Sequence, residues 1–314
     1  MIHEQVPVLC LSDFQRGDQD QRQLFSDQLF GAFQRFGFVV IRDHGISQSL
    51  LDQSYQLVAE LFALPDDVKR RYRTPDGHRG YTPFGIEKAK DSNTPDLKEF
   101  WHIGPDREVR SSLNTKNVWP DHPRGFQKIL TDLFAGLHQV GEDLLEALTF
   151  QLGVATDYFA ARVAEGDSVL RLLHYPPVPE GADPMALRAA AHEDINLITI
   201  LVAAQGAGLE LLDRDGTWLP IDSDPGDLIV DTGDMMARLT NNMLPSTTHR
   251  VVNPKGPNVS RYSMPFFMHL AADTPLTCLP TCIGEGEKYP PINAGAYLLE
   301  RLKENGVISD PPAV

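Results

Sequence analysis

The chain has 314 residues, 42% of them hydrophobic, which is enough to bury a sizeable core. Its 28 Lys and Arg residues face 43 Asp and Glu residues, so the net charge is −15. This balance argues against a nucleic acid or an anionic membrane surface as a partner. No apolar run approaches the ~20 residues that cross a bilayer, so we expect no membrane-spanning helix.

Three cysteines, Cys10, Cys278 and Cys282, are the only ones in the chain, and no two of them form a C-x-x-C pair. An odd number of cysteines without such a pair is typical of free thiols in a reducing compartment. The N-terminus also lacks the basic start and the apolar stretch of a signal peptide. We therefore expect a cytoplasmic protein.

The first half of the chain is expected to be mainly helical. Apolar residues recur at helical spacing over residues 19–36, and the compact apolar run at 38–41 predicts a buried strand. Another helix is expected at 50–64. Residues 74–123 are rich in proline and large aromatics, which predicts a long irregular segment of the kind that often binds ligands. An apolar stripe predicts one long helix over 126–152.

The second half changes to short apolar runs separated by turn residues, a pattern that predicts an all-β sandwich or barrel. The fold class is therefore mainly β with flanking helices, and one more helix is expected at 293–305. The expected strands are residues 169–175, 195–202, 208–213, 227–231, 249–253 and 261–270.

The most informative stretch is A-H-E-D-I-N-L-I-T-I-L, residues 191–201. If the strand begins here, His192 and Asp194 share one face because side chains alternate along a strand. An imidazole and a carboxylate together supply two thirds of a 2-His-1-carboxylate iron site. The pair alone carries little weight, since about 0.9 H-x-D matches are expected by chance in a chain of this composition.

A second histidine strengthens the hypothesis. His249 lies in S-T-T-H-R-V-V-N, 57 residues after His192, on another predicted strand. Neutral imidazoles and a carboxylate suit Fe(II), and three ligands on one face leave coordination positions open.

Arg261 and Ser263 form an R-x-S motif 12 residues after His249. On a strand, both side chains lie on one face. The guanidinium matches a carboxylate in a bidentate manner, and the hydroxyl can add a hydrogen bond. An isolated R-x-S most often means a surface ion pair. After a candidate metal ligand, it favours binding of the distal carboxylate of a dicarboxylic cosubstrate.

These motifs occur in a familiar order. H-E-D-I-N-L-I-T-I-L, L-P-S-T-T-H-R-V-V-N-P and R-Y-S-M-P-F-F together resemble the isopenicillin N synthase-like family of non-haem Fe(II)/2-oxoglutarate-dependent dioxygenases. The resemblance covers most of the chain, including V-P-V-L-C-L-S-D-F, G-F-V-V-I-R-D-H-G-I and G-D-L-I-V-D-T-G-D-M-M.

The resemblance implies a double-stranded β-helix (jelly roll) core with flanking helices. It implies that His192, Asp194 and His249 bind Fe(II), and that Arg261 and Ser263 bind 2-oxoglutarate. Many relatives carry N-Y-Y-P where this chain has L-H-Y-P, and the matching Tyr175 would also contact the cosubstrate.

The resemblance also implies an arrangement of domains. Residues 1–123 would form an N-terminal helical and strand region with a substrate-side loop packed on the core. Residues 124–314 would supply the long helix and the jelly-roll catalytic core. Both parts would belong to one structural unit, with the Fe(II)/2-oxoglutarate module at about 168–270.

The implied reaction consumes O2 and converts 2-oxoglutarate to succinate and CO2 while oxidising, most often hydroxylating, a C–H bond of a small organic substrate. We expect a monomer or weak homo-oligomer. Candidates for the substrate wall are the aromatics Tyr81, Phe84, Phe100 and Phe267. His102 and His269 have no partner at a telling spacing, so a structural or exposed position is expected for both.

Three alternatives stay open at the level of sequence. The first is a 2-oxoglutarate-independent Fe(II) oxidase of the same fold, in which R-x-S binds the substrate's own carboxylate, as in isopenicillin N synthase-type cyclisation. The second is a jelly-roll binding protein, against which the intact triad argues. The third is a zinc hydrolase at the same triad, which would leave R-x-S without a task. Neither the substrate nor the choice among hydroxylation, desaturation and cyclisation is fixed by sequence.

Overall fold

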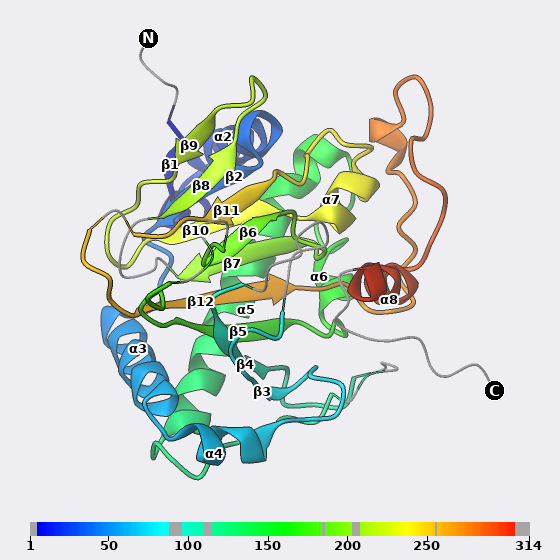
Figure 1. Ribbon diagram of the computed structural model, residues 1–314. Coiled ribbons are helices and arrows are strands. Elements are labelled where there is room, and N and C mark those ends of the chain that lie inside the picture. Colours follow the sequence, from blue (N-terminus) through cyan, green and yellow to red (C-terminus); the bar gives the residue numbers. More distant parts are fainter. Residues whose placement is uncertain are drawn as a thin grey trace, which may run out of the picture.

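Two β-sheets form the centre of the fold (Figure 1). The computed structural model describes residues 5–87, 96–109, 113, 115–181, 183, 186–202, 208–254 and 256–304. Within these ranges, eight strands form the large sheet, in the spatial order β1 (Val8–Cys10), β2 (Phe38–Arg42), β10 (Leu228–Thr232), β7 (Ile198–Val202), β12 (Arg261–Met268), β5 (Val169–Tyr175), β4 (Glu99–Ile103) and β3 (Gly80–Thr82).

The small sheet faces one side of the large sheet and completes the jelly roll, as the resemblance implied. All its strand pairs are antiparallel. In spatial order, the strands described are β6 (Ala189–His192), β11 (His249–Val251), β8 (Leu209–Leu212) and β9 (Trp218–Pro220).

Helices cover the outer side of the large sheet, where α5 runs behind β7 and β12 (Figure 1). The predicted helices at 19–36 and 126–152 are confirmed with those bounds. The helices described are α1 (Leu11–Arg16), α2 (Gln19–Phe36), α3 (Gln48–Phe62), α4 (Asp66–Lys69), α5 (Phe126–Leu152), α6 (Ala160–Val163), α7 (Asp234–Leu239) and α8 (Ala294–Glu304), with 3-10 turns at Arg70–Tyr72 and Pro280–Cys282.

Alternation along β12 separates a helix-side core from the interior of the jelly roll. Met264 and Phe266 are fully buried in the core that the helices share. Arg261 and Ser263 belong to the other face, because successive side chains of a strand point to opposite sides of the sheet. On the neighbouring strand, Tyr175 lies directly opposite Arg261. The same period therefore builds the hydrophobic core and the polar site.

Two expectations about local structure were wrong. The strand expected from residue 195 begins only at Ile198, and β6 ends at His192, so Asp194 lies in the connection between β6 and β7. The segment 74–123 is not wholly irregular, because β3 and β4 extend the large sheet at one edge. The part of that segment at 88–95, 110–112 and 114 lies outside the described residues.

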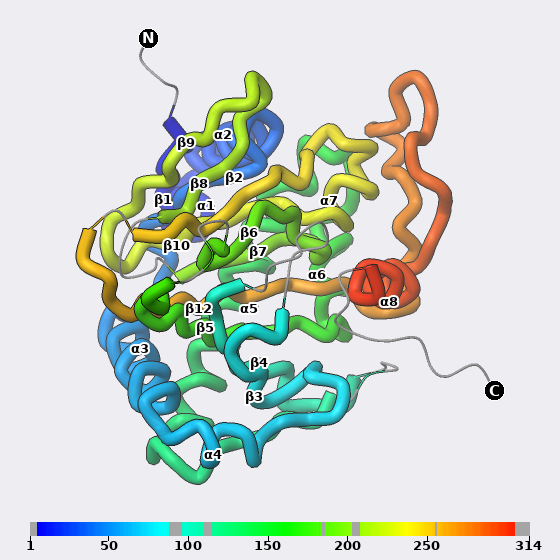
Figure 2. Tube along the Cα trace, in the orientation of Figure 1, coloured from blue at the N-terminus to red at the C-terminus, as the bar shows by residue number. Residues whose placement is uncertain are grey.

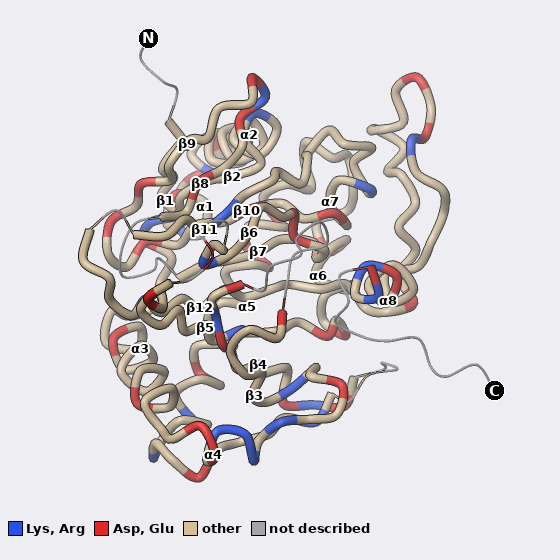
Figure 3. Tube along the Cα trace, in the orientation of Figure 1, with Lys and Arg blue, Asp and Glu red and all other residues tan. Residues whose placement is uncertain are grey.

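Segments far apart in the chain lie side by side in the fold. Figure 2 shows α2 next to β8, and Arg35 of α2 forms an ion pair with Asp213 just after β8 at 2.7 Å. In the view of Figure 3, acidic and basic positions are interspersed over helices and loops. No helix in the described part of the chain is both long and apolar enough to cross a membrane.

Candidate metal centre

His192 and His249 lie directly opposite each other in the antiparallel pair of β6 and β11. Their ring centroids are 4.4 Å apart. Nδ1 of His192 lies 2.8 Å from the carbonyl oxygen of Ala190, and Nδ1 of His249 lies 3.1 Å from that of Thr247. A carbonyl oxygen only accepts, so each Nδ1 carries the proton and each Nε2 keeps a free lone pair.

Asp194 brings a carboxylate to the same place. Its Oδ1 is 3.7 Å from Nε2 of His192 and 3.8 Å from Nε2 of His249. The ligand atoms of the three residues all lie within 4.8 Å of one another. The other carboxylate oxygen, Oδ2, accepts a hydrogen bond from the hydroxyl of Thr199, which in turn accepts one from Asn196 at 2.9 Å.

The start of α7 holds the loop that carries Asp194. The backbone N–H of Asp234 donates to the carbonyl of Asp194 at 2.7 Å. The N–H groups of Gly233 and Met235 donate to the carbonyls of Leu197 and Asn196 at 3.1 and 3.0 Å. The first N–H groups of a helix have no partner inside the helix, so they are free for this role. The carboxylate is thus positioned by a helix start rather than by strand alternation.

The electrostatics favour a neutral imidazole at His192 beside a charged carboxylate at Asp194. Burial and the neighbouring His249 lower the pKa of His192 to about 4. Burial raises the pKa of Asp194, but His249, His192 and the Thr199 hydrogen bond outweigh it, so the pKa lies below its ordinary value. Burial and then the charge of Asp194 raise the pKa of Asp231 well above the usual range.

This donor set fits a divalent transition metal. Two neutral imidazole nitrogens and one carboxylate oxygen match the 2-His-1-carboxylate arrangement that leaves coordination positions open for other ligands. Within the described residues, the triad is the one group of three or more His, Cys, Asp or Glu side chains close enough to share an ion.

Arg261, at the start of β12, carries a buried guanidinium. Arg261 is only 3% exposed, and its Nε and Nη1 have no hydrogen-bond partner among the residues that the structure describes. Its guanidinium carbon lies 5.2 Å from the ring centroid of Tyr175. Ser263 is equally buried and belongs to the same face of β12. A buried cation with unused donors is built to receive an anion.

Sequence reasoning missed a second arginine beside this site. Arg188 is 3% exposed, its Nε has no partner in the described part of the chain, and its Nη2 donates to the carbonyl of Val259 at 2.6 Å. Burial and then the charge of Arg261 lower the pKa of Arg188. No motif marks this position, because its importance comes from the pairing of distant strands.

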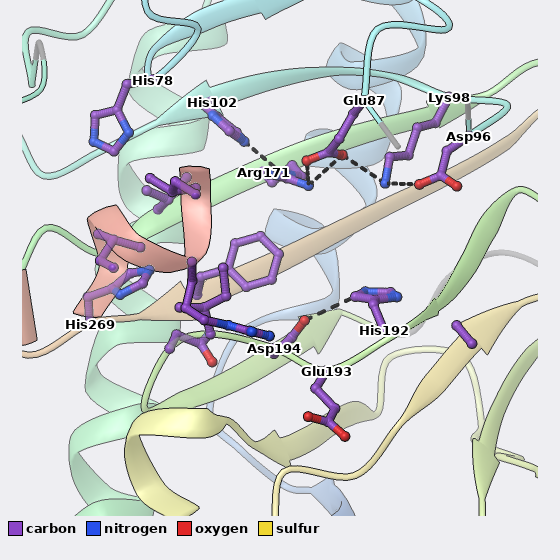
Figure 4. A pocket seen from close by; sticks show the side chains of 18 of the residues that line it. His78, Glu87, Asp96, Lys98, His102, Arg171, His192, Glu193, Asp194 and His269 are labelled. Carbon is purple, nitrogen blue, oxygen red and sulfur yellow. Dashed lines mark hydrogen bonds and ion pairs between the residues drawn. The ribbon is translucent and has the colours of Figure 1, made fainter. Parts of the chain in front are cut away.

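A cavity of about 450 Å³ opens beside the triad. Figure 4 shows His192 and Asp194 on one wall, with Arg171, Glu87 and Lys98 on the facing wall. His102 and His269 also line this cavity, although the sequence suggested no role for them. The volume and the mixed polar and apolar lining suit a small molecule.

The four aromatic candidates for the substrate wall are placed differently. Phe267 lines the cavity. Phe100 is buried on the same sheet face as Arg171, and its ring centroid lies 4.4 Å from the Arg171 guanidinium carbon, but Phe100 is not a lining residue of the cavity. Tyr81 is 1% exposed in the helix-side core, where its hydroxyl donates to Glu99. Phe84 is 39% exposed, and neither it nor Tyr81 is among the lining residues.

Comparison with known proteins agrees with the fold and the donor set. Residues 166–270 match the family described as the 2OG-Fe(II) oxygenase superfamily. Residues 6–122 match the N-terminal region described as non-haem dioxygenase in morphine synthesis. A protein of Aspergillus fumigatus named as a 2-oxoglutarate-Fe(II) type oxidoreductase is 31% identical over 95% of this chain and 92% of its own length.

Two solved structures are similar along nearly the whole chain. A 2OG-Fe(II) oxygenase family protein from Caulobacter crescentus is 42% identical, with a TM-score of 0.84 over 95% of this chain and 98% of that one. A full-length Neurospora crassa protein solved with alpha-KG (2-oxoglutarate) is 27% identical, with a TM-score of 0.85 over 96% and 98% of the two chains. That protein was also solved with alpha-KG and thymine.

The chain therefore belongs to the isopenicillin N synthase-like family of 2-oxoglutarate/Fe(II)-dependent dioxygenases. It is a non-haem iron enzyme that uses 2-oxoglutarate and O2 and acts on a small molecule.

Proposed function

We propose that His192, Asp194 and His249 bind the iron. The observation that carries the proposal is the convergence of two Nε2 atoms and one Oδ1 within 4.8 Å, each group having its other polar atom hydrogen-bonded. Hydrogen bonds to the outer atoms fix ring orientation and tautomer, which metal sites generally require.

Arg261, Ser263 and Tyr175 bind the distal carboxylate of 2-oxoglutarate in this proposal. The support is a guanidinium that is 3% exposed and has two partnerless nitrogens among the described residues. A carboxylate between Arg261 and the Ser263 hydroxyl would satisfy these donors and offset the buried charge. Arg188 adds a second positive charge to the same region.

Iron, when bound, supplies the O2 chemistry that turns 2-oxoglutarate into succinate and CO2 and oxidises a substrate C–H bond. The protein's part is to place the two organic molecules. The triad leaves coordination positions open on its cavity side, the arginines orient the cosubstrate, and the cavity walls keep the substrate beside the metal. Hydroxylation, the commonest outcome in the family, is the outcome that we propose; one oxygen atom added to the substrate in mass spectrometry tests it.

Replacing Arg261 tests the cosubstrate site. A hydrogen bond to a charged group contributes about 1.5–3 kcal/mol, so Arg261→Ala should raise the KM for 2-oxoglutarate by roughly 10- to 150-fold. Succinate formation at varied 2-oxoglutarate measures this. The matched control is Arg22→Ala, which breaks an ion pair with Glu146 between α2 and α5 and should leave that KM unchanged. An unchanged KM in Arg261→Ala would assign this arginine to something other than 2-oxoglutarate.

We also propose that the protein works in the cytoplasm as a monomer or weak homo-oligomer. The support for the compartment is that Cys10, Cys278 and Cys282 are all free thiols. Cell fractionation tests the location, and light scattering over a range of protein concentrations tests the assembly.

A further inference from the structure

We propose that the cavity beside the triad selects an uncharged substrate with a carbonyl-type oxygen, which Arg171 holds by a hydrogen bond. This inference rests on the proposed function, because it assigns the prime substrate's place to the cavity that the triad opens into. It goes further by naming the chemical class of the substrate and the residue that determines it.

Arg171 is fixed in the cavity wall. It lies on β5 on the same face as Tyr175, four residues away, and its guanidinium carbon lies 4.4 Å from the ring centroid of Phe100 and 5.2 Å from that of Phe267. Its Nε donates to Nε2 of His102 at 2.7 Å, and its Nη1 donates to Glu87 at 3.1 Å. Among the described residues, no hydrogen bond uses Nη2. The Arg171 guanidinium is therefore held in place by Nε and Nη1, and Nη2 is left as a donor.

His102 fixes the position of Arg171. Because its Nε2 accepts the hydrogen bond from Arg171, the proton of the neutral ring must be on Nδ1. Burial and the charge of Arg171 lower the pKa of His102 well below its usual value, so the ring stays neutral. Its Nδ1 is itself buried and has no partner in the described part of the chain, so the role of His102 at this wall is to hold the Arg171 side chain through Nε2.

The charges of this wall already cancel one another. Glu87 lies between Arg171 and Lys98, at 3.1 and 2.8 Å, and Lys98 also pairs with Asp96 at 2.8 Å. Burial raises the pKa of Glu87, but Arg171 and Lys98 lower it far more, so the carboxylate is charged. Burial lowers the pKa of Lys98, but Glu87 and Asp96 outweigh it, so the amine is charged too. Two positive and two negative groups leave this row neutral (Figure 4).

The cosubstrate site of the same protein shows the opposite design. Arg261 and Arg188 are buried, and neither forms an ion pair with a carboxylate among the described residues. The two uncompensated positive charges of Arg261 and Arg188 would therefore attract an anion such as a carboxylate. Arg171 has its carboxylate already, so a substrate carboxylate would lose its hydration without meeting a free cation.

The remaining features exclude a cationic group at this wall as well. The free Nη2 of Arg171 is a donor, which an ammonium group cannot satisfy. The carboxylates of Glu87 and Asp96 are already paired with Arg171 and Lys98. Glu193 accepts a hydrogen bond from Thr248 at 3.1 Å and points away from the Arg171 wall (Figure 4). An amide, lactam, imide or ketone oxygen meets both requirements. The apolar part of such a molecule has Phe267 and Leu298 to contact.

Three probes of one shape test the proposal: benzamide, benzoate and benzylamine. Calorimetry is done with Mn(II) in place of Fe(II) and with saturating 2-oxoglutarate, so that Arg261 is already occupied. Benzamide should bind at least about tenfold more tightly than either charged probe, which is the lower end of the effect of a hydrogen bond to a charged group. Tighter binding of benzoate or benzylamine, or no binding of benzamide, overturns the proposal.

Two variants test the residues named. Arg171→Gln should weaken benzamide binding about tenfold without changing the affinity for 2-oxoglutarate. Glu87→Gln removes the compensating carboxylate, so benzoate should gain about tenfold while benzamide changes little. The matched control Glu146→Gln breaks the exposed pair with Arg22 and should change neither. A benzoate affinity in Glu87→Gln equal to that of the unmodified protein contradicts the argument from charge compensation.

The affinity for 2-oxoglutarate is measured first on every sample. If the unmodified protein does not bind 2-oxoglutarate, the proposed function is contradicted. If it binds 2-oxoglutarate but benzamide does not bind more tightly than benzoate and benzylamine, only the proposed substrate class is contradicted. The probe comparison on the unmodified protein does not depend on any variant folding.

Discussion

Hydrogen bonds to the outer atoms prepare each side chain of the triad. The carbonyls of Ala190 and Thr247 fix the Nδ1 protons of the two histidines, and Thr199 occupies Oδ2 of Asp194. Among the described residues, the ligand atoms Nε2, Nε2 and Oδ1 have no other hydrogen-bond partner. Such outer contacts typically change metal affinity by 10- to 100-fold when removed.

Thr199→Val tests this preparation with almost no change in side-chain volume. It removes the hydrogen bond to Oδ2, so we expect Mn(II) affinity to fall by roughly 10- to 100-fold in a calorimetric titration. Thr281→Val is the matched control, because Thr281 donates to the carbonyl of Leu152 at 2.6 Å, outside the triad. Equal Mn(II) affinity in both variants would mean that Thr199 does not position the carboxylate.

For individual residues, the sequence predicted those features of the site that depend on the spacing of neighbouring residues. The triad residues converge, although Asp194 does so from a loop and not from a strand. Arg261 and Ser263 share a face because strands have a period of two. Arg171, His102 and Arg188 were not found. Each acquires its environment from a partner far away in the chain, such as Glu87 for Arg171, 84 residues apart.

Among the elements, the start of α7 has the clearest effect on the site. The β-branched and apolar run that follows Asp194 made a continuous strand the natural prediction, yet residues 193–197 form a connection between β6 and β7. Backbone N–H groups of Gly233, Asp234 and Met235 hold its carbonyls. A period-two argument cannot foresee this arrangement, because it depends on a helix some 40 residues further along the chain.

Gly233→Ala tests that arrangement. A Cβ at this position would overlap the backbone oxygen of Asn196, so the loop that carries Asp194 must shift. We expect at least a tenfold loss of Mn(II) affinity, at the lower end of the effect of displaced supporting contacts. Gly31→Ala is the control: a Cβ there meets nothing within 4 Å, in the interior of α2. It should raise the free energy of unfolding by about 0.5–1 kcal/mol and leave metal binding unchanged.

In the whole molecule, the two faces of the large sheet have different roles. One face of the large sheet packs against the helices, and the other face contributes to the site. Strands from residues before 123, β1 to β4, lie in the same sheet as later strands. The division of the chain at residue 123 stays a prediction. Sequence patterns suggested a ligand-binding segment at 74–123, but they could not reveal that this segment adds two strands to the edge of the large sheet.

Buried histidines should make the whole fold sensitive to acid. Burial lowers the pKa of His269 to about 4 and that of His102 well below 6.5. Between pH 6.5 and 4 the unfolded chain binds more protons at these residues, so stability falls as the pH falls. Burial raises the pKa of Asp231 and that of Asp234, and these two groups act in the opposite direction.

Urea unfolding at pH 7, 6 and 5 measures this dependence. His269→Gln removes one of the titrating groups, so its stability should fall less steeply with acid, by up to about 1.4 kcal/mol per pH unit. Parallel curves for this variant and the unmodified protein would show that His269 does not carry the effect.

The most direct test of the account is succinate formation from 2-oxoglutarate with Fe(II), O2 and ascorbate, compared between the unmodified protein and Asp194→Ala. Asp194 supplies the single carboxylate of the triad, and its backbone contact to Asp234 survives the substitution. We predict 2-oxoglutarate-dependent succinate release from the unmodified protein, and for Asp194→Ala both loss of that release and loss of Mn(II) binding. Full succinate release by Asp194→Ala would contradict the assignment of the iron site.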